Sequence, residues 1–528
     1  MAPPAKRETT GRHAFLVAAG ILLSRLVGLV RQSVFSGYFG ISYAADAFNA
    51  AFRIPNFLQN LFGEGVLSAS FIPVYARLLA EGDEEESDRV AGAVFAILAL
   101  TTSVLVLLGV LGAPLLIDAI APGFHGAKRE LTIHLVRILF PSIGLLVLSA
   151  WCLGVLNSHR KFFLSYSAPV LWNLAMIAAM LLFRHAHLER LAIWLAWGTV
   201  LGSVLQFLIQ VPPVLRVTHG LRLRPDIANV HVRDVIRNFA SVAVSRGVVQ
   251  ISAYVDQALS TLLGAGVMAA MTTAATINML PVSLFGMAVS AAELPAMAGA
   301  AGDGEAAAGA LRQRLDRGLR QIAFFIVPSA MAFFALGDVV TAALFQTGKF
   351  THAHSVYVWG IIAGSGVGLL ATTLGRLYSS TYYAMRDTRT PLRYAMVRLL
   401  LTTLLGVFCV FALPPLLGIA PRWGAAGLTA SAGVAGWVEF MLLRRGMNAR
   451  IGVTGLSFGL MVRLWGAAAA AAGVAWWVKL EIGRGHPVWL ALWVLGAYGV
   501  VYFALTYAAG IAECRALLGK VLRKLGRK

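Results

Sequence analysis

The stretch LSRLVGLVRQSVFSGYFGISYAADAFNAAFRIPNFLQNLFGEG, residues 23–65, is largely apolar but contains Arg25, Arg31, Asp46 and Arg53. Its apolar residues predict two helices long enough to cross a hydrocarbon core about 30 Å thick. A charge near the centre of a bilayer opposes insertion by about 3 kcal/mol, so the four together oppose it by roughly 10 kcal/mol. These side chains must therefore face water, another charge or a ligand.

The whole chain has the composition of an integral membrane protein. Of its 528 residues, 58% are hydrophobic and 13% are charged, whereas a soluble domain has about 25% charged residues. About fourteen apolar runs of roughly 20 residues recur from residue 13 to residue 510, and this length predicts helices and not barrel strands. We expect an all-α integral membrane protein with about 14 transmembrane helices and no large soluble domain.

The distribution of basic residues predicts the orientation. With the amino terminus in the cytoplasm, most of the 44 Lys and Arg fall in cytoplasmic segments, and this positive-inside pattern places both termini there. The net charge of +20 then reflects topology and contact with anionic membrane lipids, so no nucleic-acid surface is expected. The basic tail, residues 511–528, is expected to form a cytoplasmic helix on the membrane surface.

A weak internal repeat predicts two lobes. RIPNFLQNLFGEGVLSASFIPVYA in the second apolar run and NMLPVSLFGMAVSAAELPAMA in the eighth share an early Pro, a central Gly and Ser-Ala before a second Pro. We therefore expect two six-helix lobes as parallel repeats, followed by two extra helices. The predicted boundaries are 13–217, 230–446 and 455–510. Duplication of this kind is common in secondary transporters, which bind substrate between the halves.

The spacing of the charges bears on their role. Asp46 and Arg53 are seven residues apart, on nearly the same helix face but ~10 Å apart, so their partners are expected on another helix, in water or on a ligand. Arg25 and Arg31 lie about 9 Å apart along one helix, able to flank one cavity. A structural ion-pair network or snorkelling side chains would also explain these charges, but intramembrane charge is functional by default.

Charged residues also occur in the apolar runs of the second half: Arg246, Asp256, Glu293, Arg376 and Arg398. The surplus of Arg over acidic residues favours an anionic substrate, because the guanidinium binds phosphate through two hydrogen bonds and keeps its proton. No nucleotide-binding glycine motif or HExxH sequence is present, so we expect neither an enzyme nor a cofactor.

One cation site is conceivable from the sequence. Asp256 lies in the seventh apolar run, and Asp387 and Thr403 flank the turn into the eleventh. Their oxygen atoms are the ligand type that Na⁺ prefers, as a hard cation. The alternative is that Asp256 pairs with a nearby Arg and that Asp387 caps a cytoplasmic loop. Coupling to sodium and coupling to the membrane potential therefore both stay open.

Several motifs together resemble the MurJ/MviN family of lipid II flippases, which act in bacterial peptidoglycan synthesis. The resemblance covers nearly the whole chain and rests on SRLVGLVRQ, DAFNAAFRIPN, EGVLSASFIPVY, IAPGF, RILFPSIGLLVLSAWCLGVLNSHRKFFLSYSAPVLWN, LFQTGKF and YYAMRDTRTP. It implies the fold of the multidrug/oligosaccharidyl-lipid/polysaccharide exporters, with a cationic cavity between two lobes. It also implies that the helices over 455–510 form a groove for the polyprenyl tail.

Carried over by motif, the resemblance assigns substrate binding to Arg25, Arg31, Asp46, Arg53 and Arg376. This sequence also departs from the family pattern. Relatives usually have Arg where Gln59 stands, and they have an Asp-Arg pair and a further acid where Ala275, Thr276 and Met279 stand. These departures concern head-group recognition and not the fold.

The leading interpretation is a flippase in the bacterial cytoplasmic membrane that moves an undecaprenyl-diphosphate-linked sugar-peptide from the inner to the outer leaflet by alternating access. Lipid II and membrane lipids are the expected partners, with cell-wall synthesis proteins as further candidates. One alternative is an exporter of another lipid-linked glycan or a drug antiporter related to the multidrug and toxin extrusion (MATE) transporters. Another is a scaffold for cell-wall synthases that does not transport.

Overall fold

The computed structural model describes residues 6–300, 304–483 and 485–525, and these residues are almost entirely helical. By internal packing the chain divides into two units, residues 1–269 and 270–528. The predicted six-helix lobes and their boundaries stay a prediction, and each packed unit is described here by itself.

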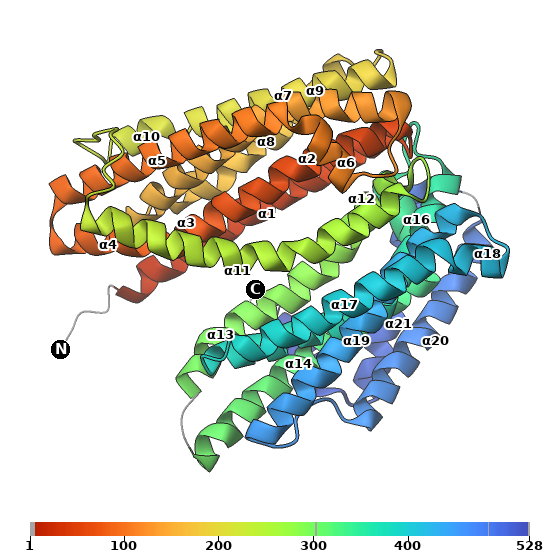
Figure 1. The fold of residues 1–528 in the computed structure, drawn as a ribbon. Helices are drawn as coiled ribbons and strands as arrows, with labels where there is room; N and C mark the ends of the chain where they lie inside the picture. The colour runs from red at the N-terminus through yellow and green to blue at the C-terminus, as the bar shows by residue number, and fades with distance from the viewer. Residues whose placement is uncertain (1–5, 301–303, 484, 526–528) are drawn as a thin grey trace. The chain divides into compact units, whose positions relative to one another are not determined.

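The first unit contains eleven helices within its described residues (Figure 1). They are α1 (Lys6–Phe39), α2 (Tyr43–Phe62), α3 (Glu64–Ser70), α4 (Ile72–Glu81), α5 (Glu84–Leu111), α6 (Ala113–Ile120), α7 (Gly126–Ser158), α8 (Phe162–Leu182), α9 (Leu188–Leu208), α10 (Val211–Leu215) and α11 (Val230–Thr261). The next helix, α12 (Val267–Pro281), begins in this unit and continues into the second.

The sequence predicted one continuous helix for the second apolar run, but the structure does not show one. The run is divided into α2, α3 and α4 at Gly63 and Phe71. Glycine permits the break at Gly63, since a Cβ atom there would lie 2.2 Å from the Gln59 carbonyl oxygen. Pro73 follows the second break at the start of α4, where its missing N–H costs no helical hydrogen bond.

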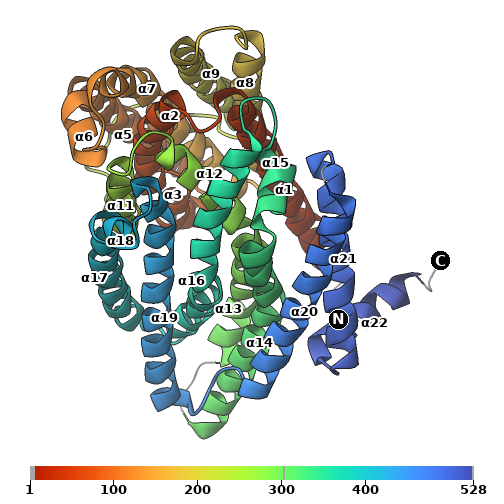
Figure 2. The same cartoon turned by 90° about the vertical axis from the view of Figure 1, so that its right-hand side faces the viewer.

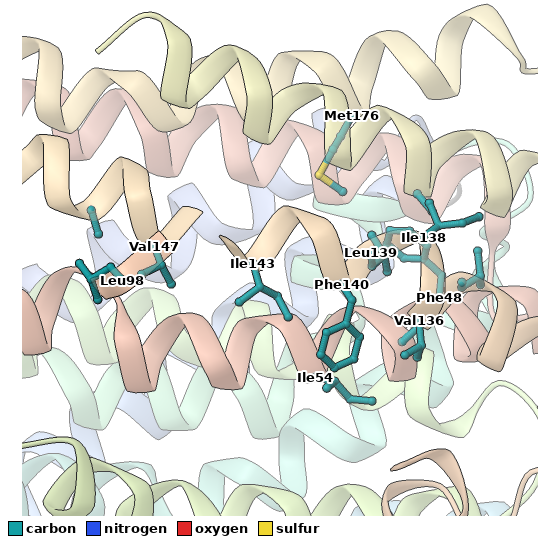
Figure 3. Packing of buried hydrophobic residues seen from close by; sticks show 14 of the residues in the cluster. Phe48, Ile54, Leu98, Val136, Ile138, Leu139, Phe140, Ile143, Val147 and Met176 are labelled. Atoms are coloured by element: carbon teal, nitrogen blue, oxygen red, sulfur yellow. The ribbon is translucent and has the colours of Figure 1, made fainter. Parts of the chain in front are cut away.

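Helix α7 is the central helix of the first unit, because most of its side chains are buried. Phe48 and Ile54 of α2 pack against Val136, Leu139 and Phe140 of α7 (Figure 3). Gly109 of α5 lies directly against the Phe140 ring, where a Cβ atom would clash at 1.8 Å. This apolar core fixes α2 and α7 relative to each other and so positions the charged residues that both helices carry.

The second unit continues with η1 (Val282–Met287), α13 (Ala288–Ala300), α14 (Glu305–Ala335), α15 (Gly337–Phe345), α16 (His352–Ala384), α17 (Arg389–Phe411), α18 (Leu413–Leu417), η2 (Pro421–Trp423), α19 (Gly424–Ile451), α20 (Phe458–Ile482), α21 (Pro487–Ala508) and α22 (Ala512–Leu525). The η1 segment is a π-helical turn directly after Pro281, an irregularity that is frequent at functional sites.

Helices α16, α19 and α17 form a layer in which α19 lies in the middle (Figure 2). Close approach of α16 and α19 requires small residues, since a Cβ atom on Gly368 would lie 2.2 Å from the Cα atom of Gly433. Helices α20 and α21 pack as a pair, and Tyr498 and Tyr502 of α21 donate hydrogen bonds to backbone carbonyls of α14.

Ten helical segments among the described residues are long and apolar enough to span a membrane. The other four predicted runs fall on α1, α2, α8 and α11. Helices α1 and α2 carry Arg25, Arg31, Asp46 and Arg53, and several side chains of α8 and α11 lie outside the described ones. The structure therefore confirms an all-helical membrane protein.

Candidate functional site

Asp46 lies in the first turn of α2, is fully buried and is bound by three donors. The Lys128 ammonium of α7 donates to its Oδ2 atom at 2.7 Å. The backbone amide of Gly266 donates to the same oxygen at 2.6 Å, and the amide of Ala269 donates to Oδ1 at 2.8 Å. Of the partners expected for Asp46, on another helix, in water or on a ligand, the structure shows one on another helix.

The surrounding chain is shaped for this contact. Gly266 has a φ of +83°, and a Cβ atom there would lie 2.3 Å from the Ile41 side chain, so glycine is required. Its amide and that of Ala269 belong to the start of α12, whose first N–H groups have no acceptor within the helix. Asp46 therefore caps α12 with a negative charge at the positive end of the helix dipole.

Arg31 lies half-buried on α1 between aromatic rings and a sulfur atom. Its guanidinium lies 5.8 Å from the ring centre of Phe52 and 5.5 Å from that of Trp172, and Nη1 is 3.6 Å from the Sδ atom of Met176. The two rings stack on each other at 5.6 Å. Within the described residues no carboxylate pairs with Arg31, and its guanidinium is met by two cation–π contacts and the Met176 sulfur atom.

Three more hydrogen-bond donors lie on α1, α2 and α8, the helices that carry Arg31, Phe52 and Trp172. The side-chain nitrogens of Gln32, Asn49 and Trp172 are buried and have no acceptor within the described part of the chain. Gln32 adjoins Arg31 on α1, and Asn49 precedes Phe52 by almost one turn on α2. Each unpaired buried donor costs about 1–3 kcal/mol. All three lie on helices that contribute to the surroundings of Arg31, namely α1, α2 and α8.

Arg53 lies two turns beyond Asp46 on α2 and is also half-buried. The Tyr254 hydroxyl of α11 donates to the Arg53 carbonyl at 3.3 Å, and the charge of Asp256 interacts with the Arg53 guanidinium. The Tyr254 ring also meets Phe57 edge to face at 5.0 Å. Asp46 and Arg53 therefore face different partners, as their separation of ~10 Å along α2 predicts.

Arg25 and Arg31 have different surroundings on α1. Arg25 is exposed, as are its neighbours Leu22, Leu23 and Leu26. Arg25 and Arg31 are six residues apart, which turns the helix far enough that only Arg31 reaches the packed aromatic rings.

In the second unit, Arg376 of α16 is near two other charged residues. Arg398 of α17 donates to Glu439 of α19, with Nη1 and Oε2 3.2 Å apart, and both charges act on the Arg376 guanidinium. Glu293 of α13 faces Arg314 of α14, with 3.8 Å between the charged atoms. The side chain of Arg246, which the sequence also places in an apolar run, lies outside the described ones.

The predicted sodium ligands are not assembled within the second unit. Asp387 accepts hydrogen bonds from the amides of Arg389 and Thr390, from the Thr390 hydroxyl and from Arg450. It therefore caps the start of α17, whereas the alternative interpretation expected it to cap a cytoplasmic loop. The Thr403 hydroxyl donates to Leu399 of its own helix, and the 14 residues from Arg389 to Thr403 span about 21 Å. Asp387 and Thr403 are too far apart to bind one ion.

The positions that depart from the family pattern carry no charge. Gln59 is half-buried on α2, and the Thr276 hydroxyl donates to Thr272 within α12. Ala275 and Met279 are exposed on α12. No group of three or more His, Cys, Asp or Glu side chains suited to a metal ion occurs among the described residues.

Sequence reasoning missed Lys128 and Trp172. Lys128 stands in the first turn of α7, where a cation opposes the helix dipole, and that unfavourable placement was the available signal for a buried acidic partner. Trp172 occurs in the SYSAPVLWN part of a motif that the resemblance used, but nothing in the sequence pairs it with Arg31.

The fold and the intramembrane cations together define a polytopic helical transporter. Solved structures with this fold include one described as "Lipid II flippase MurJ, inward closed conformation", with a TM-score of 0.76 at 22% identity over 93% of this chain and 98% of that one. An inward-facing multidrug resistance MATE family transporter of the MOP superfamily has a TM-score of 0.65 at 18% identity, covering 83% of this chain and 98% of that one.

The family follows from the sequence comparisons. The family described as "Lipid II flippase MurJ" matches residues 35–499. A lipid II flippase MurJ of Burkholderia cenocepacia is 32% identical over 94% of this chain and 97% of that protein. A probable lipid II flippase MurJ of Rhizobium tropici is 30% identical over 81% of this chain and 79% of that protein. The chain belongs to the lipid II flippase MurJ family, a family of transporters and not of enzymes.

Proposed function

We propose that this protein moves lipid II, an undecaprenyl-diphosphate-linked sugar-peptide, from the inner to the outer leaflet of the bacterial cytoplasmic membrane by alternating access. Membership in the lipid II flippase MurJ family, supported over nearly the whole chain, is the observation that carries this proposal. The distribution of Lys and Arg supports cytoplasmic placement of both termini.

Arg31 is the residue that we assign to the diphosphate. It is a cation without a carboxylate partner among the described residues, and a phosphate would give its planar donors the bidentate acceptor that aromatic rings do not. The unpaired donors of Gln32, Asn49 and Trp172 would serve phosphate or sugar oxygens in the same region. Arg53 and the exposed Arg25 extend the positive charge along α1 and α2.

We assign Asp46 a different role from that of the cations. Its side chain is fully buried and both carboxylate oxygens accept hydrogen bonds from the protein, so it joins α2, α7 and the start of α12. Breaking this joint would release the first turn of α12, which leads to the π-helical turn after Pro281. A joint of this kind lets one segment change its packing while α2 and α7 stay together.

The remaining features fit a lipid-linked substrate. The α20–α21 pair exposes large apolar side chains, among them Trp477, Trp489 and Trp493, and would contact the polyprenyl tail. Membrane lipids cover the rest of the apolar surface, and cell-wall synthesis proteins are candidate partners. Asp256 stays a candidate for sodium coupling, with the membrane potential as the other energy source.

Complementation tests the proposal directly. The gene should restore growth to a bacterium depleted of its own lipid II flippase, and purified protein in vesicles should expose labelled lipid II on the opposite leaflet. Growth without lipid II transport would indicate the scaffold alternative. Transport of another lipid-linked glycan but not of lipid II would replace the substrate assignment.

A further inference from the structure

A cluster of three charged residues occupies one level of the α16–α19–α17 layer in the second unit. Arg398 of α17 pairs with Glu439 of α19 at 3.2 Å, and the exposed Arg376 of α16 is repelled by the charge of Arg398 and attracted by that of Glu439. Two cations and one anion leave a net charge of +1. For the Arg376 guanidinium, the described residues offer no hydrogen-bond acceptor or salt-bridge partner.

The register of the three helices brings these residues together. Gly433 and Gly436 of α19 lie against Gly368 and Thr372 of α16, which places Arg376 one turn further along, level with Glu439. Helix α17 runs antiparallel to α19. Cys409 lies against Gly427, and Tyr394 against Gly446, so Arg398 faces Glu439. The same packing that builds the layer therefore sets the cluster.

The cluster lies deep in the membrane-spanning part. Arg398 is nine residues, or about 14 Å, from the start of α17, and Glu439 is 12 residues, or about 18 Å, from the end of α19. Charges at such depth are costly and mark substrate pathways. An ion pair that served only to join α17 to α19 would need one cation, and the second cation, Arg376, goes beyond that need.

We propose that Arg376 and Arg398 form an oxyanion-binding site for the head group of the lipid-linked substrate, with Glu439 as the residue that positions Arg398. The ligand is a phosphate of the diphosphate or a carboxylate of the peptide, since both present the paired oxygens that a guanidinium binds. Glu439 accepts a hydrogen bond from the Arg398 guanidinium and so fixes the orientation of that side chain. The remaining N–H groups of both arginines face the ligand. This inference rests on the proposed function.

The test measures the affinity of the purified full-length protein for lipid II. Arg376→Gln and Arg398→Gln should each weaken binding roughly 10- to 100-fold, the effect of losing a charge-assisted hydrogen bond. Arg393→Gln is the matched control, because it makes the same change on α17 at an exposed position outside the cluster. This control should bind like the wild type.

Arg398→Lys keeps the proposal testable if Arg398→Gln fails to fold because it leaves Glu439 unpaired. Lys retains the charge and the partner of Glu439 but lacks the planar fork, so folding should survive while affinity falls. The double variant Arg398→Gln/Glu439→Gln has the same net charge as the wild-type cluster. It should still bind weakly if the Arg398 fork, and not net charge, recognises the ligand.

Competing ligands identify the source of the oxyanion. Displacement of lipid II by undecaprenyl diphosphate in the wild type but not in Arg398→Gln assigns the site to the phosphate. The same result with the soluble muramyl peptide assigns it to a carboxylate. If wild type binds lipid II and the Arg376 and Arg398 variants bind within twofold of it, the inference is overturned and the proposed function stands. If wild type itself neither binds nor moves lipid II, the proposed function fails.

Discussion

Replacing Asp46 by Asn should destabilise the first unit strongly. The substitution removes the negative charge that Lys128 and the amides of Gly266 and Ala269 share at 2.6–2.8 Å. Asn retains one acceptor oxygen but turns an NH₂ group toward other donors, and Lys128 stays in a largely buried place without a counter-charge. Breaking a buried ion pair by removing one partner costs about 3–5 kcal/mol. At about 2–4 °C per kcal/mol for a unit of this size, the expected fall in Tm is on the order of 10 °C.

The buried cysteines provide the assay. Cys152 is fully buried in the first unit, so a thiol-reactive fluorescent dye labels it only when that unit unfolds. In a Cys409→Ser/Cys514→Ser background the labelling curve reports the first unit by itself. Lys128→Met should give a comparable loss. The double variant with Asp46→Asn should lose less than the sum of the two, because the two residues act as one pair.

Asp118→Asn is the matched control for Asp46→Asn. Asp118 also accepts hydrogen bonds from a cation of α7, Arg129, at 2.6 Å, but its side chain is 53% exposed. Exposed pairs contribute little to stability, so its labelling curve should match that of the wild type. A Tm for Asp46→Asn within about 2 °C of the Asp118→Asn value would refute the argument that the Asp46 joint holds α2, α7 and α12 together.

Four further outcomes are expected. Arg31→Ala should abolish complementation at normal membrane levels, and wild-type growth of the Arg25→Ala/Arg31→Ala double variant would contradict the diphosphate assignment. Thr276→Arg, which restores a cation usual in relatives, should be tolerated or improve complementation, whereas loss of growth would show that α12 excludes charge there. Asp256→Asn should change the sodium dependence of transport in vesicles, and an unchanged rate across sodium concentrations would exclude an ion-binding role. Hydrogen bonds from the Thr390 hydroxyl and amide, followed by those from Arg450, lower the pKa of Asp387. Its stabilisation is therefore present above about pH 4 and lost as the pH falls through the lowered value, so Asp387→Asn should flatten the decline of Tm in acid, and parallel curves would contradict this.

The sequence by itself determined the class of the protein. Apolar runs of about 20 residues force helices, because a chain in hydrocarbon must satisfy its own backbone hydrogen bonds. The cost of charge in a membrane identified Arg31, Asp46 and Arg53 before any contact was known. The motifs around these residues indicated the family, which the comparisons established.

Tertiary structure alone decided what each charge contacts. Asp46 and Arg53 share one helix face, yet Asp46 is bound by Lys128 and the start of α12 whereas Arg53 interacts with Asp256 of α11. Helical periodicity gives the face of a side chain but not the helix packed against it. The separation of Asp387 from Thr403 and the meeting of Arg398 with Glu439 follow in the same way from helix length and packing register. The relative register of two packed helices depends on close contacts between small residues, such as Gly368 with Gly433. These contacts join helices that are far apart in the sequence.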